Sequence, residues 1–133
     1  MFQGPIPTFR LACICCGTAV ALGAFGAHGL KDRLTPELLA VFEVGVRYQF
    51  YHGLALLACS LGPAALWRGP WMGRACWAWL AGIVIFSGSL YLLSVSGQRW
   101  LGAITPIGGV AFLLGWAFAL VAARGLHRAG TRA

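Results

Sequence analysis

Charged residues are missing from four long stretches of the chain, and this spacing is its clearest pattern. Two of the stretches have 20 residues without Asp, Glu, Lys or Arg, and the other two have 24. A helix crosses the hydrocarbon core of a bilayer with roughly 20 consecutive apolar residues. The pattern therefore predicts four membrane-spanning helices, one within each of the stretches 11–30, 48–67, 75–98 and 100–123.

The composition argues against a soluble helical bundle. Hydrophobic residues make up 59% of the chain and charged residues 10%, whereas a soluble domain carries about 25% charged residues. Four helices of a soluble bundle would also need polar outer faces, which these stretches lack. We therefore predict an all-α, polytopic membrane protein whose 133 residues form a single four-helix transmembrane domain.

Start and stop signals set the bounds of the predicted helices. Thr35-Pro36-Glu37 is a helix start, because threonine caps the first amides, proline fits the first turn and glutamate favours the positive end of the helix dipole. Thr105-Pro106 repeats part of this start. Gly29 is a candidate cap at the end of the first helix, and Gly62-Pro63 interrupts the second. The predicted helices span approximately residues 9–27, 36–66, 73–96 and 106–124.

The start of the second helix, residues 36–47, allows two arrangements. One apolar side is typical of an amphipathic helix that lies in the membrane interface before the spanning part begins. The segment could instead be the first part of one long helix, with Gly45 as a place for a bend. The apolar side consists of Leu38, Leu39, Val41, Phe42 and Val46.

The net charge of +7 fits a membrane protein better than a nucleic-acid-binding protein. The arginines stand singly at helix ends and form no cluster on one face, as a phosphate-binding surface would require. By the positive-inside rule, basic residues favour the cytoplasmic side of the membrane. Six basic residues lie on the side of both termini and four on the other side, which predicts cytoplasmic termini. The six are Arg10, Arg68, Arg74, Arg124, Arg128 and Arg132, and the four are Lys31, Arg33, Arg47 and Arg99.

Small residues mark the faces on which the helices are expected to pack closely. Lipid provides no hydrophobic driving force between helices, so close backbone approach at small residues holds a membrane bundle together. Ala19, Gly23 and Ala27 recur every four residues and form one narrow strip on the first helix. The predicted helix-packing positions are Gly23, Ala27, Gly88, Gly108 and Gly109.

Four tryptophans near the middle connection are predicted to lie at the cytoplasmic membrane interface, where indole rings with one polar edge prefer to sit. They are Trp67, Trp71, Trp77 and Trp79. The five cysteines fall within or beside apolar stretches and are interpreted as small packing residues.

The polar segment Glu43–His52 supplies most of the candidate site residues. Glu43 and Arg47 stand four residues apart in the favourable order for a helix ion pair. They are interpreted as an interface anchor pair, with a binding spot for an anionic headgroup or substrate as the functional alternative. Tyr48 and His52 share a helix face nearly opposite this pair, so other helices must complete any polar cluster. The cluster candidates are Glu43, Arg47, Tyr48, Gln49 and Tyr91.

His28 and His52 are the two histidines next to the predicted spans. Both are predicted to lie toward the same side of the bilayer, so they could approach each other across the first hairpin. Two facing histidines are the minimum for a bis-histidyl haem or for part of a metal site. Alternatively, each ring bonds to a neighbouring carbonyl or hydroxyl, because a polar group in lipid needs a partner. No cofactor is predicted, and these two residues are the candidates for binding haem or metal.

The sequence carries no enzyme signature. It lacks a Gly-x-Ser-x-Gly elbow, a phosphate-binding loop and a His-Glu-x-x-His motif, and its three acids all lie near the first connection. We predict a non-enzymatic structural or accessory component of the membrane, within a larger complex or a homo-oligomer. One alternative is a protein that binds haem, metal, quinone or lipid near His28 and His52. The other is a minimal oligomeric transporter.

Four ordered motifs resemble a known family. The motifs are Leu22-Gly23-Ala24-Phe25-Gly26-Ala27-His28, Tyr48-Gln49-x-x-His52, Phe86-Ser87-Gly88-Ser89-Leu90-Tyr91 and Thr105-Pro106-x-Gly108-Gly109. With them, the chain from Leu11 to Arg124 resembles the YgdD-like family of small inner-membrane proteins of unknown function. The resemblance implies four spanning helices and a multi-pass protein of the bacterial plasma membrane, and it implies no activity.

Overall fold

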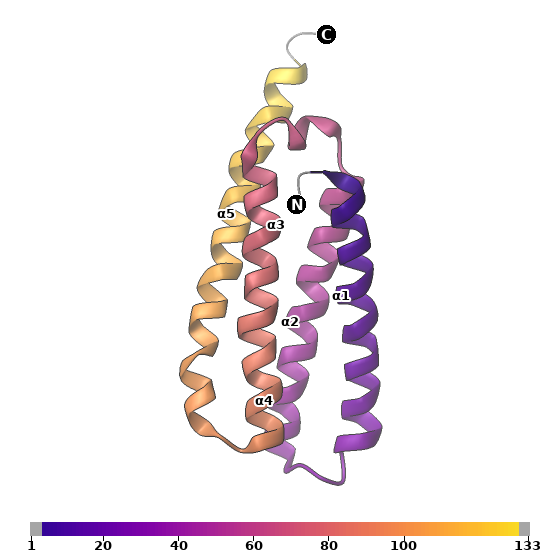
Figure 1. Ribbon diagram of the computed structural model, residues 1–133, viewed down its shortest axis with the longest axis vertical. Coiled ribbons are helices and arrows are strands. Elements are labelled where there is room, and N and C mark those ends of the chain that lie inside the picture. The colour runs from indigo at the N-terminus through magenta and orange to yellow at the C-terminus, as the bar shows by residue number, and fades with distance from the viewer. Residues whose placement is uncertain (1–3, 131–133) are drawn as a thin grey trace.

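Four helical rods run side by side in the computed structural model, which describes the backbone of residues 4–130 and the side chains of residues 4–124 (Figure 1). The described chain is all-α, as predicted. Both ends of the chain and the connection 62–69 lie at one end of the bundle, which we call the terminal end (Figure 1). The connections 31–35 and 97–104 lie at the opposite end, which we call the loop end.

The first rod consists of α1, Pro5–Phe25, and a π-helical turn η1, Gly26–Leu30. It begins at Pro5 rather than near residue 9, because proline suits the first helical turn, where its missing amide is no loss. The rod also continues past the predicted end near residue 27. Gly29 does not adopt the left-handed conformation of a C-terminal cap, so the helical path runs on to Leu30.

The second rod, α2, is one continuous helix, Pro36–Leu61, and residues 36–47 are its first part. The Thr35 hydroxyl caps it by accepting a hydrogen bond from the Leu38 amide at 3.4 Å. Hydrogen bonds from its own backbone amide and from the Thr35 hydroxyl lower the pKa of Glu37 in this first turn. The helix start predicted at Thr35-Pro36-Glu37 is therefore confirmed.

Gly45 does not interrupt α2, whereas Gly62-Pro63 interrupts the second helix as predicted. The helix passes through Gly45 without a break, and this glycine is buried against the ring of Tyr91. α2 ends at Leu61 rather than near residue 66, because Gly62 is extended and Pro63 cannot continue the hydrogen-bond ladder. A 3-10 turn, η2, Ala64–Trp67, begins the connection to the third rod.

The third rod has three parts: α3, Pro70–Gly82, a π-helical turn η3, Ile83–Ser87, and α4, Gly88–Ser96. It starts three residues before the predicted start at residue 73, again with a proline in the first turn. It ends at Gly97, whose φ of 71° is the left-handed conformation typical of a helix C-terminal cap.

The fourth rod follows a 3-10 turn, η4, Arg99–Ala103. It is a single helix, α5, Thr105–Gly130, which begins as predicted and continues past the predicted end at residue 124. The helical path therefore extends into the basic C-terminal segment as far as Gly130.

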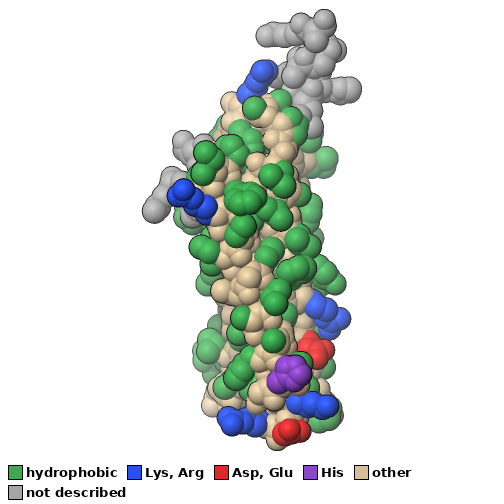
Figure 2. Space-filling model, turned by 90° about the vertical axis from the view of Figure 1, so that its right-hand side faces the viewer, with side chains coloured by type: hydrophobic (Ala, Val, Ile, Leu, Met, Phe, Trp, Pro, Cys, Tyr) green, Lys and Arg blue, Asp and Glu red, His purple; other side chains and the backbone are tan. Residues whose placement is uncertain are grey.

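Among the described residues, three helical stretches are long and apolar enough to cross a membrane, namely Pro5–Leu30, Pro70–Ser96 and Arg99–Arg124. α2 has a comparable length of 26 residues but carries polar side chains in its middle. It packs along α1 and runs the length of the bundle (Figure 1), so α2 as the fourth spanning helix stays a prediction. Hydrophobic side chains cover much of the face seen in Figure 2, and charged side chains of both signs gather toward its loop end.

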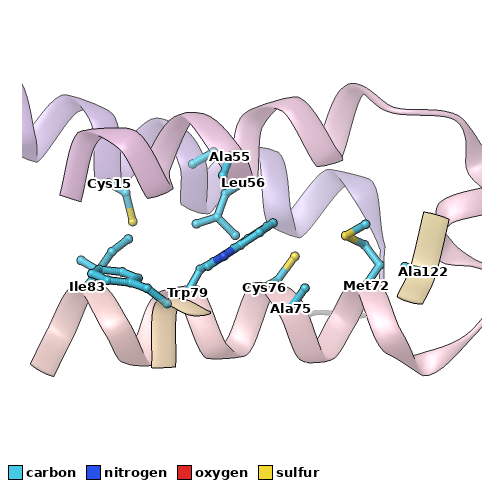
Figure 3. Packing of buried hydrophobic residues seen from close by; sticks show 11 residues of the cluster. Cys15, Ala55, Leu56, Met72, Ala75, Cys76, Trp79, Ile83 and Ala122 are labelled. Carbon is cyan, nitrogen blue, oxygen red and sulfur yellow. The ribbon is translucent and has the colours of Figure 1, made fainter. Parts of the chain in front are cut away.

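The rods associate as two pairs, α1 with α2 and α3 with α5, and α2 also packs on η3 and α4. Trp79 of α3 lies at the centre of the apolar core and has no exposed surface. Its indole points from α3 toward Leu56 of α2 (Figure 3). The predicted place of Trp79 at the membrane interface is wrong, because its ring fills the space between the two pairs of rods.

Glycines allow the closest contacts between the third and fourth rods. Gly108 of α5 lies so near the backbone of Phe86 that a Cβ would come within 2.7 Å of the Phe86 Cα. Gly115 of α5 leaves room for Trp79 in the same way, and Gly82 of α3 leaves room for Phe112. The close approach of these two rods therefore depends on the absence of side chains at the three glycines.

Of the remaining predicted packing positions, two lie at contacts between rods and two do not. A Cβ on Gly23 would meet Val46 at 3.4 Å, and one on Gly109 would lie 3.9 Å from the Phe86 ring. Ala27, expected at a helix contact, is exposed instead, and a Cβ on Gly88 would have no neighbouring atom within 4 Å. Ala27 and Gly88 thus lie on faces turned away from the neighbouring rods, which spacing along a single helix does not reveal.

Candidate functional site

Gln49, in the middle of α2, joins three rods through hydrogen bonds. Its Nε2 donates to the Thr18 hydroxyl oxygen at 2.8 Å and to the Cys15 carbonyl oxygen at 3.0 Å, both on α1. Its Oε1 accepts a hydrogen bond from the Tyr91 hydroxyl of α4 at 2.9 Å. Gln49 is 6% exposed, so these bonds lie inside the bundle.

These bonds engage every polar atom of the Gln49 side chain. The amide nitrogen has two protons to donate and both are used, while the amide oxygen accepts one bond. The Thr18 hydroxyl in turn donates to the Ile14 carbonyl oxygen at 2.7 Å. A buried network in which each member has a partner holds its residues in one arrangement. We call Thr18, Gln49 and Tyr91 the glutamine network.

His52 lies one turn beyond Gln49, and both of its ring nitrogens are occupied. Nδ1 is 2.8 Å from the Tyr48 carbonyl oxygen, and Nε2 is 3.2 Å from the indole Nε1 of Trp116 on α5. A carbonyl oxygen can only accept and an indole N–H can only donate. These partners place the ring proton on Nδ1 and make Nε2 an acceptor, so neither nitrogen is free to ligate a metal or haem iron.

His52 also packs as an aromatic ring. It stacks on Phe112 of α5 with 3.6 Å between ring centroids and an interplanar angle of 7°. Tyr48 extends the cluster, since its ring centroid lies 4.7 Å from that of Phe86 and 6.0 Å from that of Phe112. Such ring pairs contribute about 0.5–1.5 kcal/mol beyond the area they bury. The predicted shared face of Tyr48 and His52 therefore serves to pack α2 against the third and fourth rods.

His28 does not approach His52. It is exposed in η1 at the loop end, two residues beyond Gly26, which lies beside Phe42 of α2. His52 lies ten residues along α2 in the opposite direction, and twelve residues of helix rise by about 18 Å. The bis-histidyl arrangement considered from the sequence is therefore not formed. The described side chains also contain no group of three or more His, Cys, Asp or Glu that could hold a metal ion.

Glu43 and Arg47 lie on the outer surface of α2, away from the glutamine network. Both side chains are exposed. The Arg47 Nε lies 3.4 Å from the backbone carbonyl oxygen of Glu43, and the described chain forms no ion pair between the guanidinium and the Glu43 carboxylate. The pair borders a groove of about 240 Å³ between α1 and α2, which is also lined by Gly23, Gly26, Phe42 and Val46.

The structure thus divides the five cluster candidates into three groups. Gln49 and Tyr91 bond to each other, Tyr48 belongs to the aromatic cluster around His52, and Glu43 and Arg47 stand at the surface groove. The sequence analysis missed two partners, Thr18 and Trp116. Neither residue lies in a recognisable motif. Thr18 contacts Gln49, which is 31 positions away, and Trp116 contacts His52, which is 64 positions away.

Other polar side chains of the spans bond within the bundle. Ser89 of α4 lies 2.9 Å from the Thr105 hydroxyl at the start of α5, which links the third and fourth rods. Among the described side chains, the buried polar atoms without a hydrogen-bond partner are Trp79 Nε1 and Ser87 Oγ. Both are single polar atoms in a packed core, so they do not form a site.

Comparisons with known proteins agree with one another. Residues 22–109 match the family described as a protein of unknown function, DUF423. The chain is 48% identical over 106 residues to a UPF0382 membrane protein of Staphylococcus epidermidis, covering 78% of this chain and 84% of that protein. It is 49% identical over 105 residues to the UPF0382 membrane protein YwdK of Bacillus subtilis, covering 79% and 85%. No solved structure matches the chain.

Proposed function

This chain belongs to the DUF423 family of UPF0382 membrane proteins, whose function is unknown, and we propose that it is a non-enzymatic structural or accessory component of its membrane. The motif-based resemblance to a family of small membrane proteins without a known activity is confirmed by these matches. The protein is therefore a bacterial membrane protein with several apolar helices.

The observation that carries this proposal is the fully bonded glutamine network inside the bundle. The buried side chain of Gln49 has both of its donors and its acceptor engaged by Thr18, Cys15 and Tyr91 within the chain. A fully bonded interior network rigidifies a bundle and offers no unpaired group to a substrate. Polar groups of this kind in membrane helices commonly hold helices together. We infer that the protein acts through its outer surface.

The arrangement of His52 supports the same conclusion over the small-ligand alternative. A ligand site for haem or metal would need a ring nitrogen directed at the ligand, and both nitrogens of His52 have protein partners. The transporter alternative has less support, because the three acids, Asp32, Glu37 and Glu43, are all exposed near the loop end. Coupling residues of transporters face the interior of a bundle or a water-filled cavity.

We further propose that the protein lies in the plasma membrane with both termini in the cytoplasm. Both ends of the chain lie at the terminal end of the bundle (Figure 1). In the sequence, six basic residues stand near the termini and the connection 62–69, against four near the other two connections. This excess supports the proposed orientation by the positive-inside rule.

The test is extraction of the tagged protein in polymer-bounded discs of its own membrane, followed by native mass spectrometry and a visible absorption spectrum of the same sample. We expect a defined assembly of this chain with itself or with other polypeptides, without a chromophore. His52→Ala and His28→Ala variants are compared in parallel. Circular dichroism is recorded for every sample to show that the helices are retained.

Two outcomes contradict the proposal. The first is a stoichiometric non-lipid small molecule or metal that is lost from a folded His52→Ala variant and kept by the His28→Ala variant. The second is solute uptake by proteoliposomes that contain the purified chain, above that of protein-free liposomes. Either result would replace the structural role with binding or transport.

A further inference from the structure

Arg47 carries an exposed charge on the outer surface of α2, inward from the loop end of the bundle. Its neighbour Val46 lies beside Gly23 of α1, and Gly23 precedes the charged connection at Lys31 by eight residues. Eight residues of helix place this level about 12 Å from that connection toward the middle of the bundle. Arginine held in hydrocarbon is costly unless an anion or water reaches it. The described chain provides no ion pair for this guanidinium, so the position is open to an anion from outside the chain.

Glu43 stands one helical turn nearer the loop end than Arg47. Because α2 starts at the loop end, the four residues between them correspond to about 6 Å along the bundle axis. Both side chains are exposed and both border the same groove. The groove therefore presents a cation at the deeper level and an anion nearer the membrane surface. Charged side chains of both signs near the loop end are visible on the face drawn in Figure 2.

The groove itself is suited to part of a lipid. On the first rod it is lined by Gly23 of α1 and Gly26 of η1, which have no side chains to fill it, and on α2 by the apolar Phe42 and Val46. Its volume of about 240 Å³ is below the range of about 300–1,000 Å³ for sites that enclose a whole small molecule. A groove of this size suits a lipid headgroup with the adjoining glycerol, and the acyl chains would continue over the apolar surface of the bundle.

We propose that this groove binds one phospholipid whose headgroup carries a phosphate and a primary ammonium, as in phosphatidylethanolamine. The phosphate of such a lipid is next to the glycerol, and the ammonium lies beyond it on the side away from the acyl chains. This order matches Arg47 at the deeper level and Glu43 nearer the surface. Guanidinium–phosphate and ammonium–carboxylate bonds are charge-assisted and stronger than neutral hydrogen bonds.

The same pair discriminates between headgroups. A glycerol phosphate headgroup would satisfy Arg47, but the neutral glycerol beyond its phosphate brings no cation to the Glu43 carboxylate and offers only neutral hydroxyl donors. A choline headgroup carries a positive charge, but its quaternary nitrogen has no proton to donate to the Glu43 carboxylate. A primary ammonium meets both requirements. The inference rests on the groove and on the predicted crossing of the membrane by α2, and it does not depend on the proposed structural role.

The experiment uses the purified full chain reconstituted in liposomes of equal parts phosphatidylethanolamine, phosphatidylglycerol and phosphatidylcholine. The protein is then extracted in a mild detergent, and retained lipids are counted by native mass spectrometry. We expect one phosphatidylethanolamine per chain, retained about tenfold over the other two lipids, which corresponds to about 1.4 kcal/mol. Arg47→Gln should remove this retention, and Glu43→Gln should shift the preference to phosphatidylglycerol.

Matched controls change the same residue types outside the groove. Arg33→Gln and Glu37→Gln remove exposed charges at the same end of the bundle, and both should leave the retained lipid unchanged. Gly23→Leu should fill the groove, since the Cβ itself meets Val46 at 3.4 Å and is tolerated. Gly17→Leu adds the same side chain to α1 at a position with no atom within 4 Å of the Cβ, and it should keep the lipid.

Three results would overturn the inference. One is equal retention of the three lipids by the wild-type chain. Another is unchanged retention in Arg47→Gln and Glu43→Gln variants that keep their helical content by circular dichroism. The third is a lipid-free dimer that Arg47→Gln separates into monomers, which would assign the groove to a second copy of the chain.

Discussion

The Tyr91 hydroxyl donates a hydrogen bond of 2.9 Å to the Oε1 of Gln49, across 42 positions of the sequence. This bond connects α4 to α2, and the amide nitrogen of the same Gln49 connects α2 to α1. One side chain thus fixes the relative positions of three rods. Because an unpaired amide is costly in an apolar interior, any other alignment of these rods would lose stability.

Removal of either partner of this bond should destabilise the bundle. Tyr91→Phe leaves the Gln49 oxygen buried without a partner, and we expect a loss of about 1–3 kcal/mol. Gln49→Leu should cost a similar amount of stability. It removes the acceptor of the Tyr91 hydroxyl and a donor to the Cys15 carbonyl oxygen. The measurement is the unfolding free energy in mixed micelles titrated with sodium dodecyl sulfate.

The double variant Gln49→Leu/Tyr91→Phe separates the bond from general packing. We expect it to be less destabilised than the sum of the single variants by about 0.6–1.7 kcal/mol, the range seen for interhelical hydrogen bonds in membrane proteins. Strict additivity of the two substitutions would mean that the bond contributes nothing to stability.

Gly108 should tolerate no side chain. Its Cβ position lies within 2.7 Å of the Phe86 Cα, so Gly108→Ala must push α5 away from η3, at a cost of about 1–3 kcal/mol for overpacking. Gly88→Ala is the matched control, because nothing lies within 4 Å of its Cβ position. Alanine there should be neutral, or stabilising by up to about 1 kcal/mol through helix propensity. The same micelle titration compares the two, and equal effects would contradict the close contact.

His52 should behave as a packing residue and His28 as a surface residue. His52→Ala removes the stack on Phe112 and the acceptor for Trp116, and we expect a loss of about 2–5 kcal/mol, typical of large-to-small core changes. His52→Phe keeps a ring on Phe112 and should lose less. His28→Ala should stay within about 0.5 kcal/mol of wild type, as surface substitutions do. Thermal melts in detergent measure all three, and a wild-type melt for His52→Ala would refute the packing role.

The orientation of the bundle can be read with reporters fused to the C-terminus. We expect a green fluorescent protein fusion to fluoresce and an alkaline phosphatase fusion to be inactive, because the basic residues of the terminal end keep it in the cytoplasm. Replacement of Arg68 and Arg74 by Gln reduces the excess at the terminal end and should increase the phosphatase signal. An active phosphatase fusion on the unmodified chain would reverse the proposed orientation.

The sequence by itself determined the architecture. Charge-free stretches of 20–24 residues predicted four rods, and Thr35-Pro36 and Thr105-Pro106 marked two helix starts that the structure uses. These features are local, because the length of an apolar helix and the chemistry of a cap depend on neighbouring residues only. The predicted helix ends were less accurate, since the first and fourth helices continue past residues 27 and 124.

Only the tertiary structure decided what each polar or bulky residue of the spans contacts. Trp79 is an interface residue by type, yet it fills the core because Gly115 of the neighbouring rod leaves it room. His52 is a candidate ligand by type, yet Trp116 occupies its acceptor nitrogen. In a helix of apolar residues every face has similar composition, so the periodicity of one rod carries little information about its neighbours. The contacts depend on how two helical surfaces fit, and that fit is a property of pairs of rods.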